Sequence, residues 1–135
     1  MKLILALSIF LSFSLIQNPN KTDLIGQWEL IKENYKDKEY QKTIMESIIN
    51  GTYKSTLVFE ANGKYTNIFK TGSNIEGTWE ISGKNITTNN NKFVPPIPNA
   101  LHGNPSGFYN FTISNDTLIY DAHNELKGRA YYVKK

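Results

Sequence analysis

Side chains that could perform catalysis or bind a metal are scarce in this chain of 135 residues. The sequence contains no cysteine, so it has neither a thiol nucleophile nor a thiolate metal ligand. Its two histidines, His102 and His123, show none of the spacings typical of zinc sites. No Gly-x-Ser-x-Gly motif is present to position a serine nucleophile. The sequence therefore predicts no catalytic residues, no metal and no cofactor, and hence a protein that is not an enzyme.

Asp121, His123 and Glu125 come closest to a set of metal ligands. They alternate along the chain, so a strand would place all three on one face. The same stretch also fits a solvated turn between the last two predicted strands, and this is the interpretation that we favour.

A five-residue pattern, Gly-x-Trp-Glu-aliphatic, occurs twice, at Gly26–Leu30 and Gly77–Ile81. On a strand, alternation places the glycine, the tryptophan and the aliphatic residue on one face. We therefore expect Trp28 and Trp79 to be buried, and Glu29 and Glu80 to face outward. A glycine beside a large aromatic residue indicates close packing or a bend.

The first residues have the pattern of a secretory signal peptide. A short basic start is followed by an apolar run from Leu3 to Ile16, which is shorter than the roughly 20 residues that a membrane span needs. We expect residues 1–17 to be a signal peptide and residues 18–135 to be one exported domain, periplasmic or extracellular, with no integral membrane span after cleavage. An uncleaved membrane anchor is the alternative. The absence of cysteine excludes a lipid anchor at the cleavage site.

From residue 53 onward, runs of β-forming residues alternate with turn signals such as Asn62-Gly63. Together with a first strand over 25–31, the expected strands cover residues 53–60, 64–70, 75–81, 86–88, 108–113, 117–121 and 128–133. Their connections are too short for parallel crossovers. The sequence therefore predicts an all-β fold, an antiparallel up-and-down barrel of about eight strands that leaves no edge exposed.

Two segments depart from the β pattern. Apolar residues recur at helical spacing from Tyr40 to Ile49, Asp37 is suited to cap the N-terminus, and Asn50-Gly51 is suited to end the helix. We expect one short helix between the first and second strands, whose apolar face either belongs to the core or gates a ligand site. Residues 89–107 hold four of the five prolines and are expected to form an irregular segment, either a lid or a packed loop.

The charge pattern excludes one class of partner. The formal net charge is +3, both signs are interspersed, and the longest basic run is the terminal Lys134-Lys135. A nucleic-acid-binding surface is therefore not expected. The sequence identifies no protein partner.

Four segments carry a resemblance to a known family. They are Leu24–Leu30 with its Gly-x-Trp, the hairpin Leu57–Tyr65 with Phe-x-x-x-Gly-x-Tyr, the second pattern Gly77–Ile81, and the hairpin Ile113–Leu118. In this order and spacing, they resemble the bacterial lipocalin-like domains, within the calycin group of ligand-binding β-barrels. The resemblance covers nearly all of residues 18–135.

The resemblance also implies how one end of the barrel is closed. In lipocalins, a basic residue near the last strand packs across the tryptophan of the first strand. Arg129 is the residue of this sequence that matches, so closure is expected from Gly26, Trp28, Trp79 and Arg129. The alternative is that Arg129 is an ordinary arginine facing solvent.

The predicted function is the binding of a small, mostly apolar ligand at the open end of the barrel, between the 40–49 helix and the 93–101 segment. The candidate ligand-binding residues are aromatic and aliphatic: Tyr40, Ile44, Met45, Ile48, Tyr65, Phe93, Ile97 and Leu101. The alternative is a barrel filled by its own side chains, serving as a structural or protein-interaction domain of the bacterial envelope. Both alternatives are compatible with about eight strands.

Export can be tested directly. We expect protein recovered from the native envelope or medium to begin near Asn18, because residues 1–17 have the charge and length of a signal peptide. N-terminal sequencing measures the start. Recovery of an intact Met1 in a membrane pellet would indicate an anchor instead.

Overall fold

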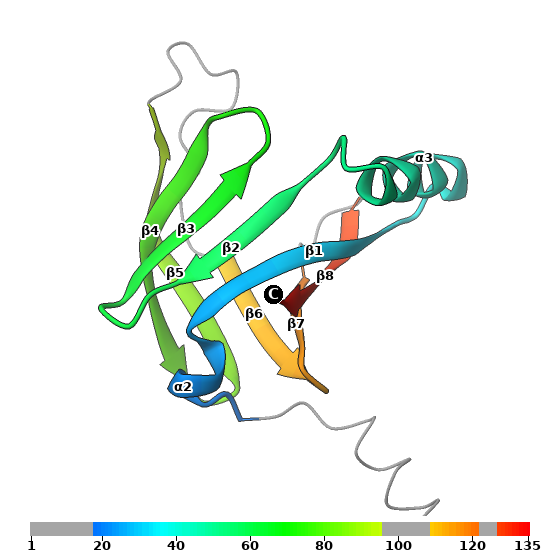
Figure 1. The fold of residues 1–135 in the computed structure, drawn as a ribbon. Helices are drawn as coiled ribbons and strands as arrows, with labels where there is room; N and C mark the ends of the chain where they lie inside the picture. Colours follow the sequence, from blue (N-terminus) through cyan, green and yellow to red (C-terminus); the bar gives the residue numbers. More distant parts are fainter. Residues whose placement is uncertain (1–17, 96–108, 122–126) are drawn as a thin grey trace, which may run out of the picture.

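The computed structural model of the chain describes residues 18–95, 109–121 and 127–135. In these residues, eight strands form one closed antiparallel barrel in sequence order, and β8 pairs with β1 (Figure 1). The strands are β1 (Gly26–Tyr35), β2 (Ser55–Phe59), β3 (Lys64–Phe69), β4 (Asn74–Ser82), β5 (Asn85–Val94), β6 (Tyr109–Ser114), β7 (Thr117–Asp121) and β8 (Lys127–Lys134). The predicted all-β up-and-down barrel is confirmed.

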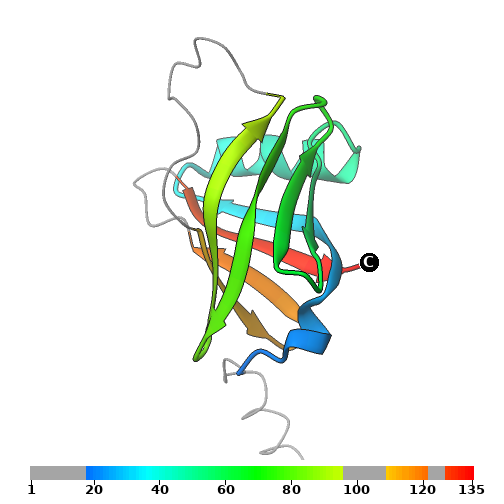
Figure 2. The same ribbon diagram turned by 90° about the vertical axis from the view of Figure 1, so that its left-hand side faces the viewer.

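Two helices lie at opposite ends of the barrel (Figures 1 and 2). The predicted helix between the first two strands is present as α3 (Lys38–Ile49), and the Asp37 side chain accepts hydrogen bonds from the backbone N–H groups of Glu39 and Tyr40. The second helix, α2 (Lys21–Leu24), was not predicted, because four residues are too few to show helical periodicity. We call the two ends of the barrel the α3 end and the α2 end.

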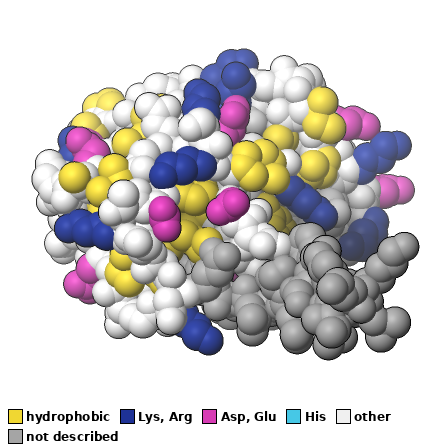
Figure 3. Space-filling model, turned by 60° about the horizontal axis from the view of Figure 1, so that its bottom comes forward, with side chains coloured by type: hydrophobic (Ala, Val, Ile, Leu, Met, Phe, Trp, Pro, Cys, Tyr) yellow, Lys and Arg dark blue, Asp and Glu magenta, His cyan; other side chains and the backbone are white. Residues whose placement is uncertain are grey.

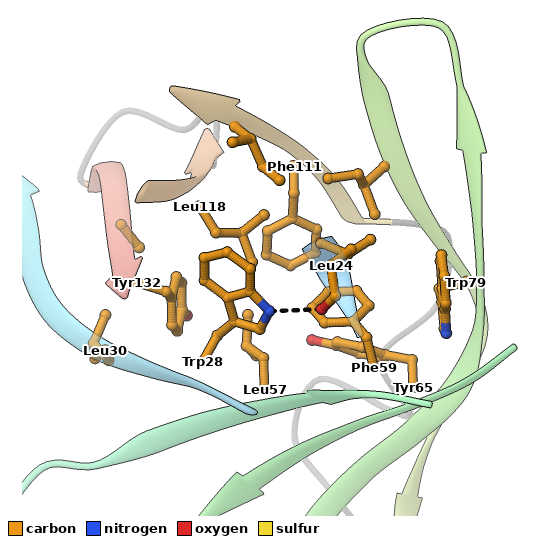
Figure 4. Close-up of a cluster of buried hydrophobic side chains, with 13 residues drawn as sticks. Leu24, Trp28, Leu30, Leu57, Phe59, Tyr65, Trp79, Phe111, Leu118 and Tyr132 are labelled. Carbon is orange, nitrogen blue, oxygen red and sulfur yellow. Dashed lines mark hydrogen bonds between the residues drawn. The ribbon is translucent and has the colours of Figure 1, made fainter. Parts of the chain in front are cut away.

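The α2 end is filled by a hydrophobic core (Figure 4). The indole Nε1 of Trp28 donates a hydrogen bond to the carbonyl of Leu24 at 2.8 Å, and that of Trp79 donates to the carbonyl of Glu60 at 2.9 Å. Both tryptophans are therefore buried with their single polar atom satisfied. The fully buried side chain of Leu24 lets α2 plug this end of the barrel.

The residue that packs across Trp28 is not Arg129, so that prediction is wrong. The register of β1 against β8 places Lys134 opposite Trp28, and the Lys134 ammonium lies 5.8 Å from the centre of the indole ring. The same ammonium donates to the carbonyl of Asp23 at 2.6 Å. Arg129 lies five residues earlier on β8 and faces Asp121, with 3.6 Å between Nε and Oδ2. The expected cation therefore comes from a lysine nearer the C-terminus.

The two glycines of the repeated pattern serve different purposes. Gly26 has φ +132°, a conformation that favours glycine. A Cβ on Gly77 would lie 2.4 Å from the carbonyl oxygen of Asn89, so only glycine allows β4 and β5 to approach this closely. A register shift occurs at the same place, where Asn90 has φ +55°. The expected close packing and bend are thus both present.

The β5 strand is longer than predicted. The sequence suggested an irregular segment from residue 89 onward, yet β5 continues to Val94. The bulge at Asn90 absorbs the break in alternation, and the prolines begin only after the strand has ended. The expected irregular segment is therefore shorter at its start, and residues 96–108 lie outside the described part of the chain.

Charges of both signs are interspersed on the face seen from the α2 end (Figure 3). No helix within residues 18–95, 109–121 and 127–135 is long and apolar enough to cross a membrane.

The core at the α2 end predicts a difference between Trp28 and Glu80. Trp28→Ala should lower the free energy of unfolding by about 3–5 kcal/mol, because it removes a buried aromatic and leaves a cavity. Glu80→Ala should change it by no more than about 0.5 kcal/mol, because Glu80 is exposed. Urea denaturation of both variants measures this. A larger loss of unfolding free energy for Glu80→Ala than for Trp28→Ala would mean that the inward and outward faces of β1 and β4 are exchanged.

Candidate ligand-binding cavity

A bulge in β1 determines which of its side chains face the barrel interior near the α3 end. Leu30 lies opposite Tyr132 and Lys32 opposite Tyr131, so Ile31 is an extra residue with no partner position on β8. Beyond this bulge the alternation is shifted by one residue. Lys32 is exposed, whereas Glu33 is only 1% exposed and faces inward.

Two tyrosine hydroxyls donate hydrogen bonds to the buried Glu33 carboxylate. Tyr35, two residues further along β1, donates to Oε2 in a very short contact. Tyr53, just before β2, donates to Oε1 at 3.1 Å. A buried carboxylate is costly unless it is paired and hydrogen-bonded, and these phenols offset part of that cost.

Both phenols remain protonated well above neutral pH. Burial raises the pKa of Tyr35 and of Tyr53, and the hydrogen bond and negative charge of Glu33 raise both pKa values further. The phenolate form is disfavoured because it would place a second negative charge beside the carboxylate. Both hydroxyls therefore act as donors over the whole physiological pH range.

A cavity of about 290 Å³ lies inside the barrel toward the α3 end. Aromatic rings form most of its wall, together with a few polar groups and the Glu33 carboxylate. The lining residues are Glu33, Tyr53, Ser55, Tyr65, Asn67, Phe69, Ile75, Tyr109, Phe111, Tyr120 and Tyr132. The barrel is thus filled in its α2 half and hollow in its α3 half.

The aromatic wall is held by contacts between ring edges and faces. Tyr109 and Tyr120 have ring centroids 5.5 Å apart in a T-shaped arrangement, and Phe111 lies 5.5 Å from Tyr120 and 6.4 Å from Tyr132. Such pairs contribute roughly 0.5–1.5 kcal/mol each beyond the burial of their area. The rings are therefore fixed in place around the cavity by one another.

A second polar group of the wall lies on β2 and β3. The Ser55 hydroxyl donates to Oδ1 of Asn67 at 2.7 Å. Burial raises the pKa of the nearby Tyr132, and a hydrogen bond with Ser55 opposes this in part. The wall therefore offers neutral hydroxyl and amide groups in addition to the Glu33 carboxylate.

Helix α3 contacts the Glu33 site through Tyr35. The rings of Tyr35 and Tyr40 meet edge to face at 4.8 Å, and the side chain of Gln41 accepts a hydrogen bond from the Tyr35 backbone N–H at 3.1 Å. The start of α3 thereby holds the tyrosine that donates to Glu33.

A hollow of about 370 Å³ lies at the α2 end, beside Asn18 and Asn20. Its polar lining residues, which include Asp23 and Lys134, are exposed. It is therefore a surface depression beside α2, whereas the cavity at the α3 end has buried aromatic and polar walls.

The structure brings only one of the eight candidate ligand-binding residues into the cavity wall, namely Tyr65. On α3, Ile44, Met45 and Ile48 are half-buried, and Tyr40 is 51% exposed. These four and the half-buried Phe93 of β5 are not among the lining residues. The remaining two candidates, Ile97 and Leu101, lie outside the described residues.

Sequence reasoning missed Glu33 because strict alternation from Trp28 places it outside and Lys32 inside. A signal was nevertheless present. Alternation from Trp28 would direct the charged Lys32 inward and leave Ile31 exposed, and a bulge after Leu30 removes the first conflict. The second conflict is not removed, because Ile31 is 43% exposed in the structure. The pattern therefore indicated a bulge without identifying its position.

One comparison with known proteins agrees with the barrel fold. The family model described as a lipocalin-like domain matches residues 24–120, which is more than half of the chain. Comparison with curated proteins and with solved structures gives no match. The match begins at Leu24, which plugs the α2 end, and extends into β7. This chain belongs to the lipocalin-like domain family.

Proposed function

We propose that this protein binds a small, mostly apolar ligand in the cavity at the α3 end of its barrel. The observation that carries the proposal is the interior cavity of about 290 Å³, walled by buried and half-buried aromatic side chains. Ligand pockets typically measure about 300–1,000 Å³ and are mostly apolar with a few polar groups. The cavity is just below the lower limit of that range, so its ligand is small.

The distribution of packing within the barrel also supports binding. Trp28, Phe59 and Leu118 are buried together in the hydrophobic core and are not among the residues that line the cavity. A barrel serving only as a filled scaffold gains stability from packing both halves. A hollow half costs stability, which is expected where a site for a ligand is retained.

We further propose that the protein acts outside the cytoplasm and that its role is binding and not catalysis. Export is supported by the signal-peptide pattern of residues 1–17. Binding is supported by the cavity wall, where phenols, one serine hydroxyl, one amide and one carboxylate surround the space; among the described lining residues, no nucleophile is paired to a base.

Binding can be tested with 2-naphthol, a small neutral aromatic compound. The purified chain should bind it with 1:1 stoichiometry in isothermal titration calorimetry. Ile75→Trp should weaken this binding by at least about tenfold, because the new indole occupies the space that Ile75 borders.

Ile68→Trp is the matched control, since Ile68 lies on the neighbouring strand and is 41% exposed. It should leave the affinity unchanged. Absence of binding to the natural chain, or equal binding by the two variants, would favour a barrel that acts as a structural or protein-interaction domain.

A further inference from the structure

We infer that the ligand presents a carbonyl oxygen to the Tyr65 hydroxyl and to neighbouring hydroxyls of the cavity wall. This inference rests on the proposed function and specifies the chemical class of the ligand, namely a small, uncharged carbonyl compound with an apolar body. A plain hydrocarbon would fill the same space but would give these hydroxyls no hydrogen-bond acceptor.

The first argument is the position of the Tyr65 hydroxyl. Tyr65 lines the cavity, is only 1% exposed, and its hydroxyl points into the barrel interior (Figure 4). Within the described part of the chain, no group accepts a hydrogen bond from it. A buried donor without an acceptor is costly, so a ligand that supplies the acceptor gains from this contact.

The second argument is the company of Tyr65. The ring of Phe111 lies 6.3 Å from that of Tyr65 and 5.5 Å from that of Tyr120, centroid to centroid. Tyr109 lies 5.5 Å beyond Tyr120, and both of these tyrosines are half-buried residues of the cavity wall. Their hydroxyls also have no acceptor among the described residues. Three phenols that lack a protein acceptor therefore line one cavity.

All three phenols are protonated at neutral pH. Burial raises the pKa of Tyr65, Tyr109 and Tyr120, and the neighbouring phenols raise that of Tyr65 further. Each hydroxyl therefore has a proton to donate. A carbonyl oxygen has two lone pairs, so it can accept from Tyr65 and from a second donor at once.

The other polar groups of the wall leave the same need. Tyr35 and Tyr53 donate to Glu33, so the inferred contact does not involve that carboxylate. Oδ1 of Asn67 accepts from Ser55, which leaves the amide N–H groups of Asn67 as further donors. The described wall thus has several donors that a ligand acceptor can satisfy.

Acetophenone and 2-phenylpropene test the inference, because they share a shape and differ in a carbonyl oxygen against a methylene group. Isothermal titration calorimetry gives their affinities for the natural chain and for Tyr65→Phe. The substitution should weaken acetophenone binding about five- to tenfold, because one hydrogen bond is lost. It should not weaken 2-phenylpropene binding, because in that complex the hydroxyl has no acceptor. Comparing both compounds in both proteins cancels the greater hydrophobicity of 2-phenylpropene.

Tyr131→Phe is the matched control. Tyr131 lies on β8, is half-buried, and is not among the residues that line the cavity. Its hydroxyl accepts a hydrogen bond from the side chain of Asn34. Loss of this hydroxyl should leave both affinities unchanged.

The carbonyl stretch of bound acetophenone provides a second measurement. A hydrogen bond lowers this stretching frequency, so infrared difference spectra with the natural chain should place it below its value in hexane. In Tyr65→Phe the frequency should move toward the hexane value. If Tyr65→Phe does not fold, the spectrum with the natural chain decides the question alone.

The results that would overturn the inference differ in what else they affect. If 2-naphthol or 2-phenylpropene binds but acetophenone does not, the inference is wrong and the proposed function stands. The same holds if Tyr65→Phe weakens both compounds equally, or if the bound carbonyl absorbs at its hexane frequency. If none of these compounds binds, both the inference and the proposed function are wrong.

Discussion

One extra residue in β1 determines the character of the whole α3 half of the barrel. Ile31 has no partner position on β8, and the strand therefore changes the face it presents between Leu30 and Lys32. Without this bulge, a lysine would point into a ring of tyrosines and the glutamate would lie in solvent. With the bulge, the Glu33 carboxylate is buried, and the tyrosines around it donate hydrogen bonds to it or line the cavity. The cavity, its charge and its polar contacts all depend on that one-residue shift in the alternation of β1.

The two halves of the barrel meet opposite energetic requirements. At the α2 end, large side chains pack into the hydrophobic core, and the indole N–H groups of Trp28 and Trp79 each find a carbonyl within 2.9 Å. At the α3 end, space is left empty and a charge is buried, both of which cost stability. The packed half compensates for the hollow half. Such a division is typical of a small domain that retains a site at the expense of some stability.

Helix α3 contributes to the core through its apolar face, one of the two roles that its amphipathic pattern suggested. Ile48 packs against the hydrophobic core cluster, and no residue of α3 is among the described lining of the cavity. Its specific contribution is at its first turns, where Tyr40 and Gln41 hold Tyr35. The helix therefore reaches the cavity through the tyrosine that donates to Glu33.

Much of the fold could be predicted from the sequence, and the site could not. Turn signals such as Asn62-Gly63 and clean alternation around Trp79 identify strands, because both are local properties. The bulges at Ile31 and Asn90, and the pairing of Trp28 with Lys134 in place of Arg129, depend on register between strands that are distant in sequence. One residue of register exchanges the inside and the outside of a strand. Glu33 was missed for that reason.

The central claim, that Glu33 faces the aromatic cavity, can be measured directly by nuclear Overhauser spectroscopy on the isotopically labelled protein. We predict cross-peaks between the Glu33 Hγ protons and the ring protons of Tyr53, and none between the Lys32 side chain and the rings that line the cavity. Cross-peaks from Lys32 to these rings, with none from Glu33, would show that the strand continues without a bulge and would contradict the account.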